Sequence, residues 1–183
     1  MNKGATISDD KIYRYSLYRI WNDELPKVAI VGLNPSTADE NIDDPTIKRC
    51  IEFVKNWGYG GFYMLNLFSY RATDPSELSK VIDPVGKDNE KIILETISKV
   101  DKVICAWGNG GNYLNQNIKI LSLINSPYCL KINQSGEPSH PLYLKRDLKP
   151  IALVMSNIEK EASKNIEPEK NIENNVTDTN LII

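Results

Sequence analysis

The chain has 183 residues, of which 41% are hydrophobic, and its formal net charge is −2. This length and composition predict one folded domain with one substantial core, and the charge excludes a protein coated with basic residues. Acidic residues outnumber lysines from Ile158 onward, so residues 1–157 are close to neutral and local nucleic-acid binding stays open. We expect a single α/β domain over 1–157 and a polar tail with little fixed structure over 158–183.

The cysteine pattern and the lack of long apolar runs exclude several further classes. Cys50, Cys105 and Cys129 are widely spaced and form no C-x-x-C motif. We therefore expect no disulfide framework, structural zinc or iron–sulfur cluster. The N-terminus lacks the apolar core of a signal peptide, and no run approaches the roughly 18 apolar residues of a membrane span. These features predict a cytoplasmic protein without membrane contact.

The first predicted elements are strands. Residues 1–9 are expected to be a loose start, and residues 13–21 alternate aromatic or aliphatic side chains with polar ones, as in an edge strand or hairpin. Residues 28–31 are apolar without alternation, which indicates a strand buried on both faces of a parallel sheet. Asp44 then caps a helix with Pro45 at its first position.

Strands and helices continue to alternate along the rest of the chain. Further core strands are expected at residues 62–67, 103–107 and 128–132, and helices at 88–98, at roughly 112–124 and from Thr73-Asp74-Pro75 onward. Residues 148–155 fit a last helix or strand. The alternation predicts a three-layer α/β/α sandwich with a mainly parallel, four-stranded central sheet.

The segment Gly32-Leu33-Asn34-Pro35-Ser36 follows the first core strand. Gly, Asn, Pro and Ser all favour turns, so a strand-ending turn explains the segment without any function. The functional interpretation is that Asn34 holds a water or a substrate edge at the carboxyl end of the sheet, where open α/β sheets bind ligands. The segment is not a P-loop, and Gly108-Asn109-Gly110-Gly111 does not match the dinucleotide-binding fingerprint.

Three carboxylates, Asp39, Asp43 and Asp44, come shortly after this segment. The structural interpretation is that Asp44 caps a helix and that Asp43 is a solvated loop residue. Alternatively, Asp39 or Asp44 in a partly dry cleft activates a water or stabilises a cationic sugar. No histidine accompanies them, which makes a Mg²⁺ site a minor alternative, and we expect neither a metal nor a cofactor.

Asn66, Arg71 and His140 are the remaining polar candidates. Asn66 ends the second core strand, where it either pins the adjacent loop or recognises a nucleobase edge through its donor and acceptor. Arg71 either holds a phosphate or serves as a surface or capping residue. His140, the only histidine in the chain, is either structural or donates a hydrogen bond to negative charge on a leaving group.

Taken in order, these motifs resemble those of the uracil-DNA glycosylase superfamily. The matching segments are Gly32-Leu33-Asn34-Pro35-Ser36, Met64-Leu65-Asn66, Ala106-Trp107-Gly108 and His140-Pro141. The resemblance covers residues 28–145 and implies the α/β/α fold of that superfamily.

The resemblance also implies roles for single residues. Asn34 would hold the hydrolytic water or contact the flipped nucleotide, Asn66 would recognise the base edge, and His140 would stabilise the departing anionic base. The chain departs from the family pattern after His140-Pro141, where Leu142-Tyr143-Leu144-Lys145 stands in place of Ser-Pro. With Asn66, the residues expected to bind substrate are Gly32, Ser36, Arg71, Trp107 and Gly108.

The first hypothesis is a monomeric, monofunctional DNA glycosylase that removes a damaged or modified base, such as a modified pyrimidine of viral DNA. It would act in repair or in defence against foreign DNA, and the target base would have to leave the duplex stack. Candidate DNA contacts are Lys48, Arg49, Arg71, Lys145 and Arg146.

Two alternatives remain open. One is a non-catalytic module of the same fold that binds a nucleotide or nucleic acid. The other is an enzyme that acts on free nucleosides or nucleotides, which the modest charge of residues 1–157 favours over a tight DNA binder.

Overall fold

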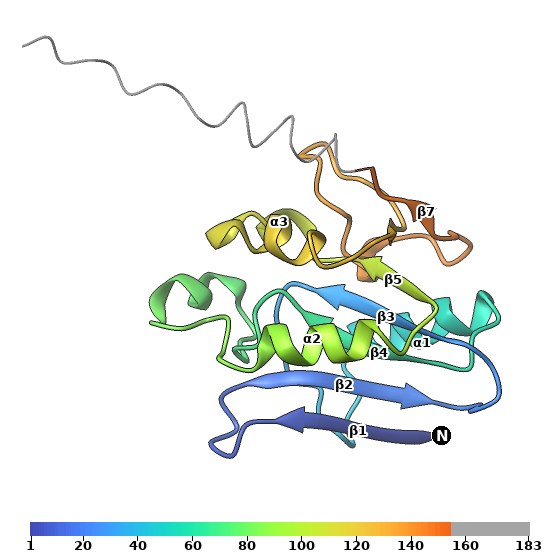
Figure 1. Ribbon diagram of the computed structural model, residues 1–183, viewed down its shortest axis with the longest axis horizontal. Helices are drawn as coiled ribbons and strands as arrows, with labels where there is room; N and C mark the ends of the chain where they lie inside the picture. The colour runs from blue at the N-terminus through green and yellow to red at the C-terminus, as the bar shows by residue number, and fades with distance from the viewer. Residues whose placement is uncertain (155–183) are drawn as a thin grey trace, which may run out of the picture.

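One mixed β-sheet runs through the computed structural model, which describes residues 1–154 (Figure 1). From edge to edge the strand order is β1-β2-β4-β3-β5-β6-β7. The strands are β1 (Asn2–Ile7), β2 (Arg14–Ile20), β3 (Lys27–Gly32), β4 (Gly61–Asn66), β5 (Lys102–Cys105), β6 (Pro127–Cys129) and β7 (Ile151–Ala152).

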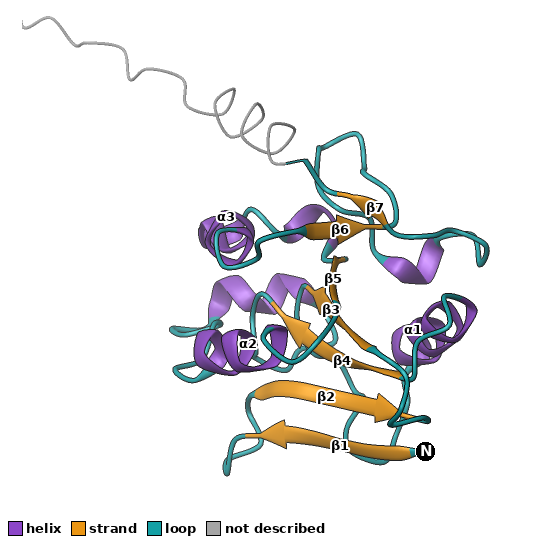
Figure 2. Cartoon of the chain, turned by 45° about the vertical axis from the view of Figure 1, so that its right-hand side comes forward, coloured by secondary structure: helices purple, strands orange, loops and turns teal. Residues whose placement is uncertain are grey.

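Helices cover both faces of this sheet. Figure 2 shows α1 on one face and α2 and α3 on the other. The α-helices are α1 (Pro45–Asn56), α2 (Asn89–Ile97) and α3 (Gln116–Leu121), and the short 3₁₀ segments are η1 (Pro75–Lys80), η2 (Gly108–Gly110), η3 (Tyr113–Asn115) and η4 (Pro141–Tyr143). No helix within residues 1–154 is both long enough and apolar enough to span a bilayer.

The central strand β3 contributes to both halves of the core. Val28 and Ile30 pack in the cluster that includes Phe53 of α1, whereas Ala29 and Val31 pack in the cluster of α2 and α3. Successive side chains of a strand point to opposite faces, so a strand covered on both sides must be apolar throughout. This is why the apolar run correctly predicted a buried strand.

The α/β class is confirmed, but the sheet is larger than predicted. The four expected core strands are β3, β4, β5 and β6, which run parallel to one another. Antiparallel pairing adds β1 and β2 at one edge and β7 at the other. The loose start predicted for residues 1–9 is wrong, because Asn2–Ile7 is an edge strand whose polar, exposed residues carry little hydrophobic pattern.

Of the edge strand or hairpin expected for residues 13–21, the hairpin is found, because β2 pairs antiparallel with the preceding β1, and the edge position is wrong. β2 lies between β1 and β4, and its polar side chains Arg14, Ser16 and Arg19 are buried. The register with β1 shifts by one residue, since Thr6 faces Ser16 while the adjacent Ile7 faces Arg14. This β-bulge adds a residue to β2 and changes the direction of the side chains that precede it.

The helices expected after Asp44 and over 88–98 are confirmed as α1 and α2, whereas the one expected from Thr73-Asp74-Pro75 onward is the short 3₁₀ segment η1. Asp44 caps α1 by accepting a hydrogen bond from the Ile47 amide, 2.8 Å away. The helix expected over 112–124 is shorter, because Leu114 and Asn115 have φ values of 51° and 54° and interrupt it. Of the last helix or strand expected over 148–155, the described part, 148–154, forms the strand β7 at Ile151–Ala152. The tail predicted at 158–183 lies outside the described residues.

Candidate functional site

A cavity of about 510 Å³ opens at the carboxyl ends of the parallel strands. Its lining comes from the segments that follow β3, β4 and β5, together with the beginnings of α1 and η4. The crossover after β3 and the crossover after β5 leave toward opposite faces here, and open α/β sheets bind ligands at such a point. The predicted residues that line it are Gly32, Asn34, Ser36, Asp44, Asn66, Trp107, Gly108 and His140.

Asn66 is a buried amide whose own side chain is left without hydrogen bonds. The residue is 1% exposed, and neither its Nδ2 nor its Oδ1 has a hydrogen-bond partner among residues 1–154. A Cβ at Gly32 would lie 3.0 Å from this Oδ1 and 2.6 Å from Met64 Cε, so glycine leaves room beside the amide. A donor and an acceptor on one fixed group therefore remain available to a ligand.

The side-chain nitrogen of Asn34 holds this residue in place. Its Nδ2 donates to the carbonyl oxygens of Ala72, at 2.7 Å, and of Pro35, at 3.1 Å. The first bond ties the end of β3 to the loop after β4, so the loop-pinning role weighed for Asn66 belongs to Asn34. The carboxamide oxygen of Asn34 remains as the acceptor for a water or ligand in the cavity.

His140 is half-buried and begins η4. Its Nδ1 accepts from the Leu142 amide at 3.4 Å, which leaves Nε2 as the position for the proton of the neutral ring. Burial lowers the pKa of His140 below its ordinary value of 6.5, and the charge of Asp44 opposes this shift only in part. The ring is therefore neutral at pH 7 and can donate a hydrogen bond from Nε2.

Asp44 has the capping role predicted for it and also lies at the cavity. It caps α1, and its carboxylate also lines the cavity and acts electrostatically on His140 and Arg14. Within residues 1–154 no three His, Cys, Asp or Glu side chains are grouped as metal ligands.

Asp39 and Arg71 do not reach this cavity. The Asp39 carboxylate accepts from the amides of Asn41 and Ile42, each at 2.8 Å, and these bonds hold the pKa of Asp39 below its usual value. Arg71 Nη1 donates to the Lys11 carbonyl at 3.3 Å, and both residues line a separate hollow beside β1. The structure thus gives Asp39 a turn-forming role, and it places Asp39 and Arg71 together at this second hollow, away from the predicted residues that line the cavity.

Trp107 is held by a buried carboxylate that the sequence did not point out. Glu137, 6% exposed, accepts from Trp107 Nε1 at 2.5 Å and from Asn117 Nδ2 at 2.7 Å. The next residue, Gly108, has a φ of 76° and donates its amide to the Pro138 carbonyl. These bonds join the segment after β5 to the loop that carries His140.

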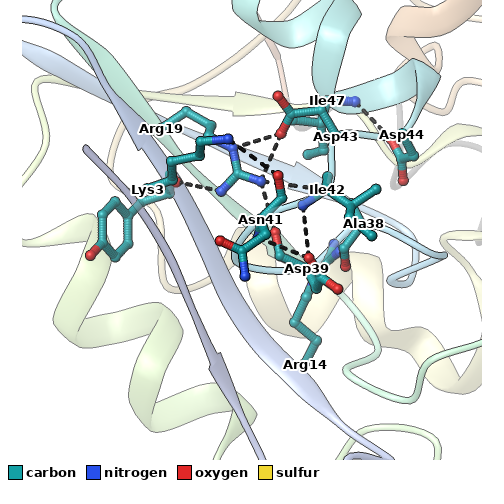
Figure 3. A network of polar contacts seen from close by, with 11 residues as sticks. Lys3, Arg14, Arg19, Ala38, Asp39, Asn41, Ile42, Asp43, Asp44 and Ile47 are labelled. Carbon is teal, nitrogen blue, oxygen red and sulfur yellow. Dashed lines mark hydrogen bonds and ion pairs between the residues drawn. The ribbon is translucent and has the colours of Figure 1, made fainter. Parts of the chain in front are cut away.

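The loop between β3 and α1 is anchored by a buried arginine (Figure 3). Arg19 is fully buried and pairs with Asp43 at 2.7 Å, and its Nη2 also donates to the carbonyls of Asp39 and Ile42. Asp43 is therefore an ion-pair partner, which corrects its interpretation as a solvated residue. The anchor places Asp44, one residue later, at the cavity.

Arg14 is a charged cavity residue that sequence reasoning missed. The side chain is 2% exposed and donates from Nη1 to the Ala38 carbonyl at 2.6 Å. Strict alternation would place positions 14 and 19 on opposite faces, but the β-bulge brings both arginines to the loop that follows Ala38. Predicting this position from the sequence would have required recognising the bulge, and β2 contains no proline or glycine that would indicate one.

Comparisons with known proteins identify a family without a function. A family model described as "Protein of unknown function (DUF1643)" matches residues 14–142, which include the cavity-lining residues from Arg14 to Leu142. Neither the curated proteins nor the solved structures contain a match. Since the matched segment is more than half of the chain, this protein belongs to the DUF1643 family.

Proposed function

We propose that this protein is a DNA glycosylase-like enzyme of the uracil-DNA glycosylase type. It would hydrolyse the N-glycosidic bond of a damaged or modified base that has been flipped out of DNA, and leave an abasic site. The single observation that carries this proposal is the buried Asn66 amide, whose donor and acceptor both lack partners among residues 1–154 at the wall of a ligand-sized cavity.

The Asn66 amide matches the chemistry of a nucleobase edge. Pyrimidines present a carbonyl beside a ring or exocyclic nitrogen, and one carboxamide can bond both groups at once. A buried polar group without a partner costs about 1–3 kcal/mol, so the fold loses stability by keeping Asn66 in this state. A ligand that supplies both bonds would recover that free energy, which supports recognition of an amide-like ring.

His140 supports the bond-breaking step. When the glycosidic bond breaks, its electron pair leaves with the base, which becomes an anion, and the sugar becomes cationic. The neutral imidazole, with its proton on Nε2, would donate a hydrogen bond to the base oxygen where negative charge accumulates.

Asn34 and Asp44 would handle the water. The Asn34 oxygen can accept one hydrogen bond from a water in the cavity, and the Asp44 carboxylate can accept the proton that this water loses as its oxygen bonds to C1′ of the sugar. The products are then the free base and the abasic sugar, and the proton finally passes from Asp44 to the departed base or to solvent.

Abasic-site formation tests the proposal directly. Purified protein would be incubated with oligonucleotides that contain uracil or one of a panel of modified pyrimidines, and the strands would then be cleaved with alkali. We expect cleavage at one class of base. His140→Gln should lower the rate by about 100-fold or more, as removal of a transition-state donor does, and Asn66→Leu should lower it by about 10- to 100-fold.

A matched control is an exposed asparagine away from the cavity. Asn125 lies just before β6, and Asn125→Ala should leave the rate unchanged. Loss of base release in Asn66→Leu but not in Asn125→Ala would support recognition by Asn66. No abasic site with any substrate, at protein concentrations equal to that of the DNA, would contradict the proposal.

A second candidate, an enzyme of free nucleosides or nucleotides, is favoured by the charges near the cavity. Arg49 and Arg146, two of the expected DNA contacts, both pair with Glu52, at 3.1 and 3.5 Å. Phosphate contacts make DNA binding fall steeply with salt, whereas a nucleoside pocket responds little. Release of base from nucleosides at a rate that does not change with salt would therefore favour this candidate over DNA.

A further inference from the structure

The cavity contains a buried cation that no resemblance assigned. Arg14 is 2% exposed, and its Nε is buried without a hydrogen-bond partner among residues 1–154. A guanidinium has five N–H donors, and the only side-chain bond of Arg14 within that part of the chain is the one from Nη1 to Ala38. Most of its hydrogen-bonding capacity is therefore unused, and it lines the same cavity as the equally unused amide of Asn66.

The charge of Arg14 also lacks a direct counterion. No carboxylate of residues 1–154 lies within ion-pair distance of it, although Asp44 acts on it from farther away. Burial lowers the pKa of the guanidinium to about 10, so the group stays cationic at neutral pH. Keeping an unpaired charge in a protein interior is unfavourable, and a bound anion would offset that cost.

A purely structural role does not account for this arrangement. Arg19, on the same strand, is a structural arginine: it has an ion pair with Asp43 and donates to the loop carbonyls of Asp39 and Ile42. Arg14 supports the same loop through the single bond to Ala38, and it faces the cavity, which Arg19 does not.

We propose that Arg14 binds an anionic group of the ligand, so that the substrate of this cavity is a nucleobase or nucleotide that carries an acidic group next to the edge bonded by Asn66. The group is either an acidic substituent of the base or a phosphate of the nucleotide, since a guanidinium binds carboxylate and phosphate oxygens alike. This inference rests on the proposed nucleobase site and adds the charge of its ligand.

Two pairs of ligands test the inference on the wild-type protein. Calorimetry would compare uracil with 5-carboxyuracil, and uridine with uridine 5′-monophosphate, because the members of each pair differ by one anionic group. We expect one acidic member to bind about 10- to 100-fold more tightly than its neutral counterpart, as hydrogen bonds to a charged group do. The pair that shows the preference identifies the source of the anion.

Variants then locate the preference. Arg14→Gln keeps a donor for Ala38 but removes the charge, and it should abolish the preference for the acidic ligand. Arg14→Lys should retain part of it. The matched control Arg19→Gln should lower thermal stability but keep the preference, because Arg19 does not line the cavity. Circular dichroism would establish that each variant is folded.

Two results would overturn the inference: equal affinity for both members of each pair in the wild type, or a preference that persists in Arg14→Gln. Failure of the proposed function is recognised separately. If acidic ligands bind through Arg14 but no substrate yields an abasic site, the anion site stands and the glycosylase activity does not. If abasic sites form without any preference for acidic ligands, the glycosylase activity stands and the anion site does not.

Discussion

Two groups of buried polar side chains in this protein differ in how well their hydrogen bonds are satisfied. At Glu137, the carboxylate is bonded by both Trp107 and Asn117. At the cavity, Arg14 Nε and both polar atoms of Asn66 have no partner among residues 1–154. The first group joins loops together, whereas the polar atoms of the second group remain available to a ligand in the cavity.

The contrast separates stability from function. Of the six buried side-chain nitrogens and oxygens without a partner in the described chain, three belong to Arg14 and Asn66. Asn66 is the described residue in which both polar atoms are affected, whereas the amide nitrogen of neighbouring Asn89 bonds the carbonyls of Asn66 and Leu67. Polar groups kept without partners at one place are typical of a site that gives up stability for binding.

Removing the Glu137 carboxylate, which Trp107 and Asn117 both bond, should have the largest effect on stability. Glu137→Leu leaves Trp107 Nε1 and Asn117 Nδ2 buried without their acceptor, so the free energy of unfolding should fall by about 3–5 kcal/mol. Urea denaturation followed by tryptophan fluorescence measures this. A loss below about 1 kcal/mol would mean that water reaches both donors.

Removing the loop anchor should cost somewhat less. Arg19→Met leaves Asp43 without its ion-pair partner, and Asp43 retains 18% side-chain exposure, which partly solvates the charge. We expect a loss of about 2–4 kcal/mol in the free energy of unfolding. The loop after β3 should also become more mobile, which hydrogen exchange at the amides of Asn41 and Ile42 would detect.

Replacing the Asn66 amide should change stability in the opposite direction. Asn66→Leu removes two unsatisfied groups and replaces them with an apolar side chain of similar size, so stability should stay unchanged or rise by up to about 2 kcal/mol. Chemical denaturation of the variant and of Asn125→Ala would be compared. A loss of more than 1 kcal/mol would show that Asn66 supports the fold and would remove the contrast with Glu137.

His140 should give the smallest effect, visible as a pH dependence. Because burial lowers its pKa in the folded state, the unfolded chain binds more protons below its ordinary pKa of 6.5. The folded protein should therefore lose stability as the pH falls below 6.5, and no such contribution should appear above it. The denaturation midpoint of His140→Gln should depend less on pH over this window than that of the wild type. Equal slopes would indicate a solvated imidazole.

Local chemistry was enough to predict the centre of the fold and many of the cavity residues. The unbroken apolar run of β3, the cap at Asp44 and the amide that ends β4 are short-range patterns, and each was found where expected. Because parallel strands end at one edge of the sheet, these patterns predicted Asn34 and Asn66 at that edge, and the family resemblance added His140; all three line the cavity. Asp39 and Arg71 were misplaced because proximity in the chain was taken for proximity in space.

The amino-acid sequence by itself determined the parallel α/β centre of this protein and the two amides at its carboxyl edge, because periodicity, capping and strand ends are properties of neighbouring residues. Only the tertiary structure decided that the polar strand β2 is internal, that a bulge brings Arg14 to the cavity and that Glu137 holds Trp107. These features depend on register and on contacts between distant segments. A buried arginine with a partner and one without look the same until the surrounding chain has folded.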